Sequence, residues 1–91
     1  MIDKAGAIPT ILTKLKKMDV GHGIDLRTFK RDRSVVIVRR TEALFTVNED
    51  GFHTEQFETD IKGMRKLLKT LLKREFPRSN KIRTSEIKSS R

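Results

Sequence analysis

The clearest pattern of hydrophobic and polar positions in the chain lies between Asp60 and Phe76. Apolar residues recur there at the 3.6-residue period of an α-helix, and lysines recur at the same period on the opposite side. This pattern predicts a helix that buries one face and keeps a line of ammonium groups in water. The apolar arc consists of Ile61, Met64, Leu67, Leu68, Leu71, Leu72 and Phe76. The lysine row consists of Lys62, Lys66, Lys69 and Lys73, with Arg65 between the two faces.

A second helical pattern runs from Ile8 to Met18. Its apolar residues share one face, and lysines occupy its last turns, where cations suit the negative end of the helix dipole. The segment from Asp19 to Gly23 is expected to end this helix, because its two glycines supply backbone freedom. We expect Thr59 or Asp60 to cap the longer helix and Pro77 to end it.

Between the two helical patterns the sequence favours β-strands. Ile24 to Arg31 forms the first predicted strand, and Ser34 to Arg40 forms the second. Four consecutive β-branched residues in the second strand indicate a central position in a sheet, with both faces at least partly covered. Two further strands, Ala43–Val47 and Phe52–Phe57, flank a turn at Asn48–Gly51, whose glycine is available for positive φ.

The register of this last hairpin follows from its apolar residues. A four-residue loop places Val47 opposite Phe52 and Phe45 opposite Thr54, which gives the hairpin one apolar side. A shift by one residue would place Val47 opposite His53 and lose that side. We therefore expect the first register.

These elements predict an α+β fold. Ninety-one residues suffice for one core. We expect a two-layer sandwich in which an N-terminal and a long C-terminal helix pack on an antiparallel sheet of three to four strands, in the order α-β-β-β-β-α. Residues 1–77 would form this single domain. Residues 78–91 are polar and basic, and are expected to form a flexible tail in which Lys81–Thr84 could make one short strand.

The order of these elements resembles that of the double-stranded-RNA-binding domain and of the Alu-binding subunits of the signal recognition particle. That domain opens its second helix with a Lys-Lys-x-Ala-Lys type run, whereas this sequence has Asp60-Ile61-Lys62-Gly63-Met64 there, and the extra hairpin strand also departs from the pattern. The resemblance therefore concerns topology and transfers no site residue. The run Glu75–Arg83 after a lysine-rich helix is similar to small basic archaeal proteins.

The charge of the chain is concentrated at its C-terminal end. The net charge is +9, and residues 60–91 hold eleven Lys/Arg against three acidic residues. Residues 27–40 are also basic, whereas residues 41–59 hold acids and no base. Such a distribution attracts polyanions, nucleic acid before anionic membrane, although a solvated surface that only keeps the protein soluble gives the same composition.

The candidate nucleic-acid contacts fall into two clusters. A line of cations can follow phosphates and gain affinity by counterion release, and arginine can also bind phosphate with its planar fork. The first cluster is the lysine row and its neighbours: Lys62, Arg65, Lys66, Lys69, Lys73, Arg74, Arg78, Lys81 and Arg83. The second cluster follows the first two strands: Arg27, Lys30, Arg31, Arg33, Arg39 and Arg40.

Phe29 belongs to the second cluster as a candidate for stacking on a base. Strand alternation places Ile24 and Leu26 on one face and Phe29 on the other, with Arg27 and Arg31 beside it. An aromatic residue between arginines on an exposed sheet is typical of a stacking platform. The alternatives are that a bulge returns Phe29 to the core or that a partner subunit covers it.

The sequence offers little for catalysis, and we expect neither an enzyme, a metal nor a cofactor. It has no cysteine and two histidines, His22 in a turn and His53 near Glu55, and a zinc site of the deaminase type needs cysteine ligands. The N-terminus lacks the apolar run of a signal peptide and no stretch is long enough for a membrane span, so we expect a cytoplasmic protein. Of the two nucleic acids, we expect the protein to bind RNA in preference to DNA.

A protein-interaction module or a homodimer is the alternative. Val35–Val38 offers apolar side chains to both faces of the sheet, and the helices of one chain can cover only one of them. The acidic segment Glu42–Glu58 could also meet the basic helix of a second subunit. Binding to an anionic membrane is disfavoured, because the apolar stripe of the long helix is needed to close the core.

Overall fold

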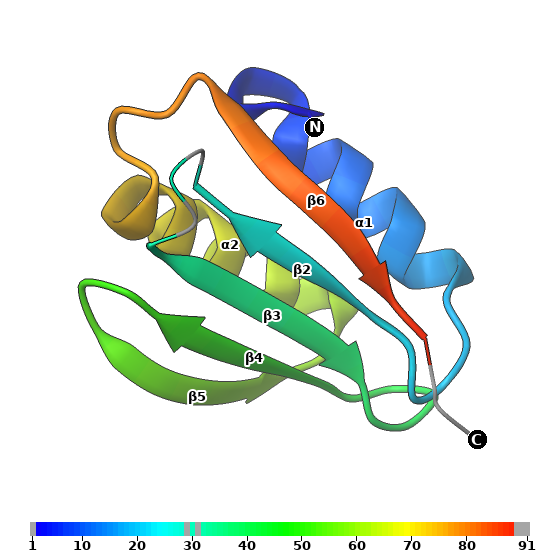
Figure 1. The fold of residues 1–91 in the computed structure, drawn as a ribbon. Coiled ribbons are helices and arrows are strands. Elements are labelled where there is room, and N and C mark those ends of the chain that lie inside the picture. Colours follow the sequence, from blue (N-terminus) through cyan, green and yellow to red (C-terminus); the bar gives the residue numbers. More distant parts are fainter. Residues whose placement is uncertain (1, 29, 31, 89–91) are drawn as a thin grey trace.

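The computed structural model describes residues 2–28, 30 and 32–88, and within them one antiparallel sheet is covered on one face by two helices (Figure 1). The strand order is β1-β6-β2-β3-β4-β5. The strands are β1 (Ile2–Asp3), β2 (Gly23–Arg27), β3 (Ser34–Arg39), β4 (Phe45–Asp50), β5 (Thr54–Thr59) and β6 (Lys81–Ile87). The helices are the short 3₁₀ turn η1 (Lys4–Gly6), α1 (Ala7–Lys17) and α2 (Ile61–Glu75).

Both predicted helices are confirmed. The Asp60 carboxylate caps α2 by accepting a hydrogen bond of 2.8 Å from the N–H of Gly63. At the other end, the helix stops before Pro77, and the Lys4 ammonium donates to the carbonyl oxygen of Phe76. The N-terminus of the chain is thus tied to the end of α2.

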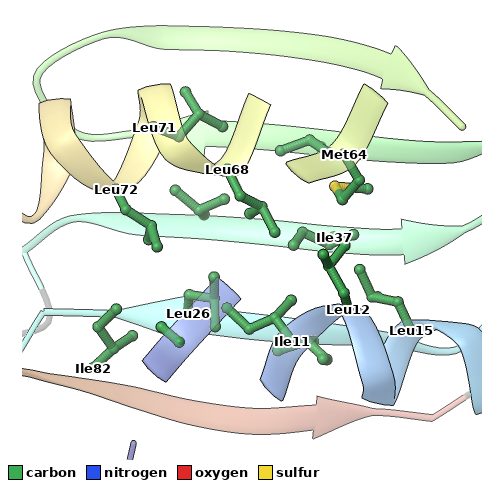
Figure 2. Packing of buried hydrophobic residues seen from close by; sticks show 14 of the residues in the cluster. Ile11, Leu12, Leu15, Leu26, Ile37, Met64, Leu68, Leu71, Leu72 and Ile82 are labelled. Carbon is green, nitrogen blue, oxygen red and sulfur yellow. The ribbon is translucent and has the colours of Figure 1, made fainter. Parts of the chain in front are cut away.

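The core lies between the helices and the sheet (Figure 2). The two helices run in opposite directions across the sheet, as the labelled residues of α1 and α2 in Figure 2 show. On the sheet side, alternate residues of the central strands point toward the helices and are buried, as expected from strand alternation. These buried strand residues are Ile24, Leu26, Val35, Ile37, Phe45 and Val47.

Strand β3 lies between β2 and β4, so its predicted position inside the sheet is confirmed. Val35 and Ile37 are buried under the helices, whereas Val36 and Val38 are half-buried on the opposite face. Figure 1 shows that this second face of the sheet is turned toward the viewer, with both helices behind it. The helices of one chain therefore cover one face of the β-branched run.

The prediction that residues 78–91 form a flexible tail is wrong for Lys81–Ile87. This segment is β6, which lies between β1 and β2 and pairs with β2 from Arg83 to Ile87. Its Ile82 is fully buried. The described sheet has six strands, so the prediction of three to four strands is also wrong. The double-stranded-RNA-binding domain was compared by its element order, and the strand after α2 is a further departure from that order. The short strand expected at Lys81–Thr84 is part of β6, and its continuation to Ile87 is mostly polar, so no apolar alternation in the sequence indicated it.

The register predicted for the β4–β5 hairpin is wrong as well. Val47 pairs with Phe57 and Asp50 pairs with Thr54, so that β4 continues through the expected turn. The reason lies outside the hairpin. The carboxylate of Glu75, at the end of α2, accepts hydrogen bonds of 2.7 and 3.0 Å from the N–H groups of Phe52 and His53.

Gly51 is required in this turn for space. A Cβ atom at this position would collide with the Glu75 carboxylate and the Arg33 side chain. Positive φ, which we expected there, occurs among the described glycines at Gly21, where φ is 93° after the end of α1. The first strand also ends earlier than predicted, at Arg27, and Phe29 and Arg31 lie outside the described residues.

Candidate nucleic-acid interface

The lysine row of α2 lies on the outer side of the helix layer. Lys62, Lys66, Lys69 and Lys73 are all exposed, and so is Arg65. Within the part of the chain that the structure describes, no hydrogen bond or ion pair links these five side chains to an acceptor. Their charges face solvent because the apolar arc of the same helix is taken up by the core.

The helix layer also carries exposed lysines that neither candidate cluster included. Lys14, Lys16 and Lys17 at the end of α1 are exposed on the same layer. Their helical period placed them away from the apolar face of α1, so the sequence contained the signal. They were interpreted only as residues that suit the helix dipole.

Arg74 follows the lysine row in sequence and has a different environment. Its guanidinium donates two hydrogen bonds, of 2.8 and 2.7 Å, to the carboxylate of Glu49 on β4. The hydrogen bond with Glu49 raises the pKa of Arg74, against the smaller effect of desolvation. Glu49 itself is only 1% exposed. Arg74 therefore neutralises a buried carboxylate. Its planar guanidinium suits this role because it donates one hydrogen bond to each carboxylate oxygen.

Three other arginines hold loops and strand ends together. Arg39 donates to the carbonyl oxygens of Met18 and Glu42, both at 2.6 Å, and its guanidinium lies 5.5 Å from the centre of the Phe45 ring. Arg40 donates to the Thr46 hydroxyl at 3.1 Å. Arg33 donates to the Glu75 carbonyl at 3.3 Å, and its Nε lies 3.9 Å from the Glu75 carboxylate.

Arg27 lies on the sheet face opposite the helices. It is paired with Asp25 at 3.0 Å, and in the sheet it stands beside Arg83 of β6. Arg27 and Arg83 border an open hollow of 410 Å³ together with Thr84 and Ser85. Since α2 covers the other face, the structure separates Arg27 from the lysine row. Lys81, at the start of β6, pairs with Asp3 at 3.8 Å.

The remaining candidates gather at the end of the molecule where α2 stops. Lys30, Arg33 and Arg78 line a hollow of 570 Å³ there, together with Asp32 and Glu75. Lys30 and Arg78 are exposed. The placement of Phe29 and Arg31 lies outside the described residues, so the stacking prediction for Phe29 stays a prediction.

Two buried carboxylates were missed in the sequence. Glu49 and Glu75 come from β4 and α2 and meet under the β4–β5 hairpin. Burial of Glu75 acts to raise its pKa. The hydrogen bonds that it accepts from the N–H groups of Phe52 and His53, together with the charge of Arg33, act against burial, and the pKa of Glu75 lies below its ordinary value. The helical period places Glu75 on the apolar arc with Leu68 and Leu71, so the sequence held a signal for its burial, whereas Glu49 lay in the expected turn and gave none.

The histidines occupy separate sites. His53 lies in the hairpin turn, its ring centre 5.0 Å from that of Phe52, while His22 lines a hollow beside α1. Over the described residues there is no cluster of three or more His, Asp or Glu side chains that could hold a metal ion. In the same residues, no helix is both long and apolar enough to cross a membrane.

A scan against protein-family models found no match, and no curated protein matches the chain. Among solved structures, the fold is similar to one titled "Crystal Structure of Pseudomonas Avirulence Protein AvrPphB", with a TM-score of 0.57 and 13% sequence identity. The match covers 94% of this chain and 47% of the other, so the chain spans about half the length of that protein. At this identity the likeness concerns the α+β fold alone.

Proposed function

We propose that the protein binds nucleic acid, RNA in preference to DNA, by contacting phosphates with the outer side of α2. The observation that carries this proposal is the exposed lysine row with Arg65, which has no acidic partner among the described residues. The preference for RNA rests on the helix–strands–helix order from α1 to α2, a likeness to RNA-binding domains in topology alone, which does not choose between single and double strands.

The geometry of the row suits a phosphate backbone. Its lysines are three or four residues apart, which corresponds to steps of roughly 4.5–6 Å along a helix axis. Ammonium groups bind phosphate oxygens without distinguishing bases, so the row supplies affinity without sequence preference. Arg39, Arg40 and Arg74 are engaged inside the protein, and we leave them out of this contact.

The test is a salt titration of binding with a variant in which the four lysines of the row become glutamine. Each lost phosphate contact lowers the slope of log affinity against log salt by roughly 0.7–0.9. The matched control replaces four exposed cations outside both candidate clusters, Lys14, Lys16, Lys17 and Lys88, with glutamine and so removes the same charge. Equal slopes for the two variants would reduce the binding to a net-charge effect and overturn the proposal.

A second function is an interaction through the uncovered face of the sheet, with a homodimer as its simplest form. Val36, Val38 and Ile87 lie half-buried on the strands of this face, and no described element covers it. Sedimentation across a wide concentration range tests this function. A dimer that dissociates in the Val36→Lys variant supports it, and a monomer at the highest concentration excludes it.

For both functions we place the protein in the cytoplasm. The sequence has no cysteine and therefore makes no use of an oxidising compartment, and neither function calls for a cofactor. Fractionation of cells that produce the full chain measures its location directly.

A further inference from the structure

A groove runs between α2 and the outer edge of the sheet. The edge strand β5 pairs with β4 on one side and with no described strand on the other. In Figure 1 β5 forms the outer border of the sheet, and α2 lies behind the sheet at β2 and β3. The groove has a volume of 360 Å³ and includes Phe57 and Glu55 of β5 and Leu67 of α2. This volume lies at the lower end of the range of roughly 300–1,000 Å³ found for small-ligand sites.

The groove offers two surfaces on which a flat ring can stack. The first is the Phe57 ring, which is half-buried next to the half-buried Leu67. The second is the guanidinium of Arg74, whose plane is fixed by its two hydrogen bonds to Glu49 while 30% of the side chain stays exposed. Aromatic rings and arginine planes are the groups on which unpaired bases stack in proteins that bind single strands.

The charged residues at the groove favour a base inside it and the phosphates beside it. Lys66 belongs both to the lysine row and to the wall of the groove, so a phosphate on the row lies next to the groove. Glu55 lines the groove, and a carboxylate there repels a phosphate and is able to accept N–H groups from the edge of a base.

We propose that this groove takes one unpaired nucleobase from a single strand whose phosphates follow the lysine row. The inference rests on the proposed function and narrows its ligand to single-stranded nucleic acid. A base paired in a duplex is stacked between its neighbours and cannot enter the groove without being unpaired and flipped out.

The first experiment places a fluorescent reporter in the groove. The chain contains no tryptophan and no tyrosine, so the Phe57→Trp variant carries one indole at the proposed stacking site. We expect saturable quenching of its fluorescence by a twelve-nucleotide cytidine RNA and none by a twelve-base-pair RNA duplex at equal occupancy. Phe52→Trp is the control, because Phe52 is 69% exposed at the hairpin turn and outside the groove. No quenching at position 57, or equal quenching by strand and duplex, overturns the proposal.

The second experiment measures affinity with Phe57→Leu, which keeps an apolar side chain and removes the aromatic ring. Affinity for the single strand should fall about 5- to 150-fold, the equivalent of one lost stacking contact, while affinity for the duplex stays unchanged. If this variant fails to fold in a urea titration, the fluorescence of Phe57→Trp decides the question.

The outcomes separate this inference from the function on which it rests. If the four lysine substitutions reduce binding and neither Phe57 variant responds, the groove does not hold a base and the phosphate contact remains. If wild-type protein binds neither strand nor duplex more tightly than a basic protein of equal charge, both proposals fail.

Discussion

The inner and outer sides of α2 place adjacent cations of the sequence in opposite environments. Lys73 and Arg74 are neighbours, yet Lys73 is exposed and Arg74 is bound to the buried Glu49. The inner side also buries Leu68 and Leu71 completely. The ion pair of Arg74 with Glu49 therefore contributes to stability, whereas Lys73 does not contribute to it and its charge is available to phosphates. The following substitutions test this division.

The largest effect is expected from Arg74→Met. This variant leaves the carboxylate of Glu49 buried without its partner, which should cost about 3–5 kcal/mol of unfolding free energy, toward the lower end because water reaches the Arg74 side of the pair. Urea unfolding measures it. Lys73→Met is the control on the outer side and should change stability by less than about 0.5 kcal/mol. If both variants unfold alike, the two sides of α2 do not differ. The double variant Arg74→Met, Glu49→Met should recover most of the loss.

A smaller effect is expected where the inner side is apolar. Leu68→Ala opens a cavity in the core and should cost about 2–5 kcal/mol, while Lys69→Ala beside it should have almost no effect on stability. Thermal unfolding at one protein concentration compares the two variants. An unchanged melting temperature for Leu68→Ala would mean that α2 does not close the core.

The helices and their buried faces were predictable because the information is local. A period of 3.6 residues places Met64, Leu68 and Leu71 on one face whatever the rest of the chain does. The alternation that buries Ile24 and Leu26 is local in the same way. The fold class followed from these patterns, and the position of β3 inside the sheet followed from its β-branched run.

The strand β6 and the hairpin register depend on contacts between distant residues. Arg83 pairs with Arg27 across more than half of the chain, and the hairpin turn is held by Glu75 from another element. The role of an arginine depends on its tertiary partner, as Arg74 and Glu49 show across 25 residues of sequence. Charge counts located the basic helix and could not tell which cations were already engaged.

A third substitution tests the inner carboxylate that faces the hairpin. Glu75→Gln weakens the hydrogen bonds to the N–H groups of Phe52 and His53 and should cost about 1–3 kcal/mol at neutral pH. Because the folded-state pKa of Glu75 lies below its ordinary value of 4.5, its contribution is complete above that pH and is lost as the pH falls through the folded pKa. Urea titrations between pH 3 and 7 should therefore show a shallower acid decline for the variant. An identical decline would assign the acid sensitivity to other groups.

The smallest effect on stability, and a measurable one on binding, is expected from a single change on the outer side. Lys69→Gln removes one exposed ammonium group that contacts no described acceptor, so the unfolding free energy should stay within about 0.5 kcal/mol of the wild type. If Lys69 contacts a phosphate, the log–log salt slope of RNA binding should fall by roughly 0.7–0.9. Lys17→Gln on α1 removes the same charge away from the row and is the control. A lower slope for Lys69→Gln alone would assign a phosphate to the row, because net charge is equal in the two variants. An equal fall for both would reduce the binding to a net-charge effect, and an unchanged slope for Lys69→Gln would remove this lysine from the interface.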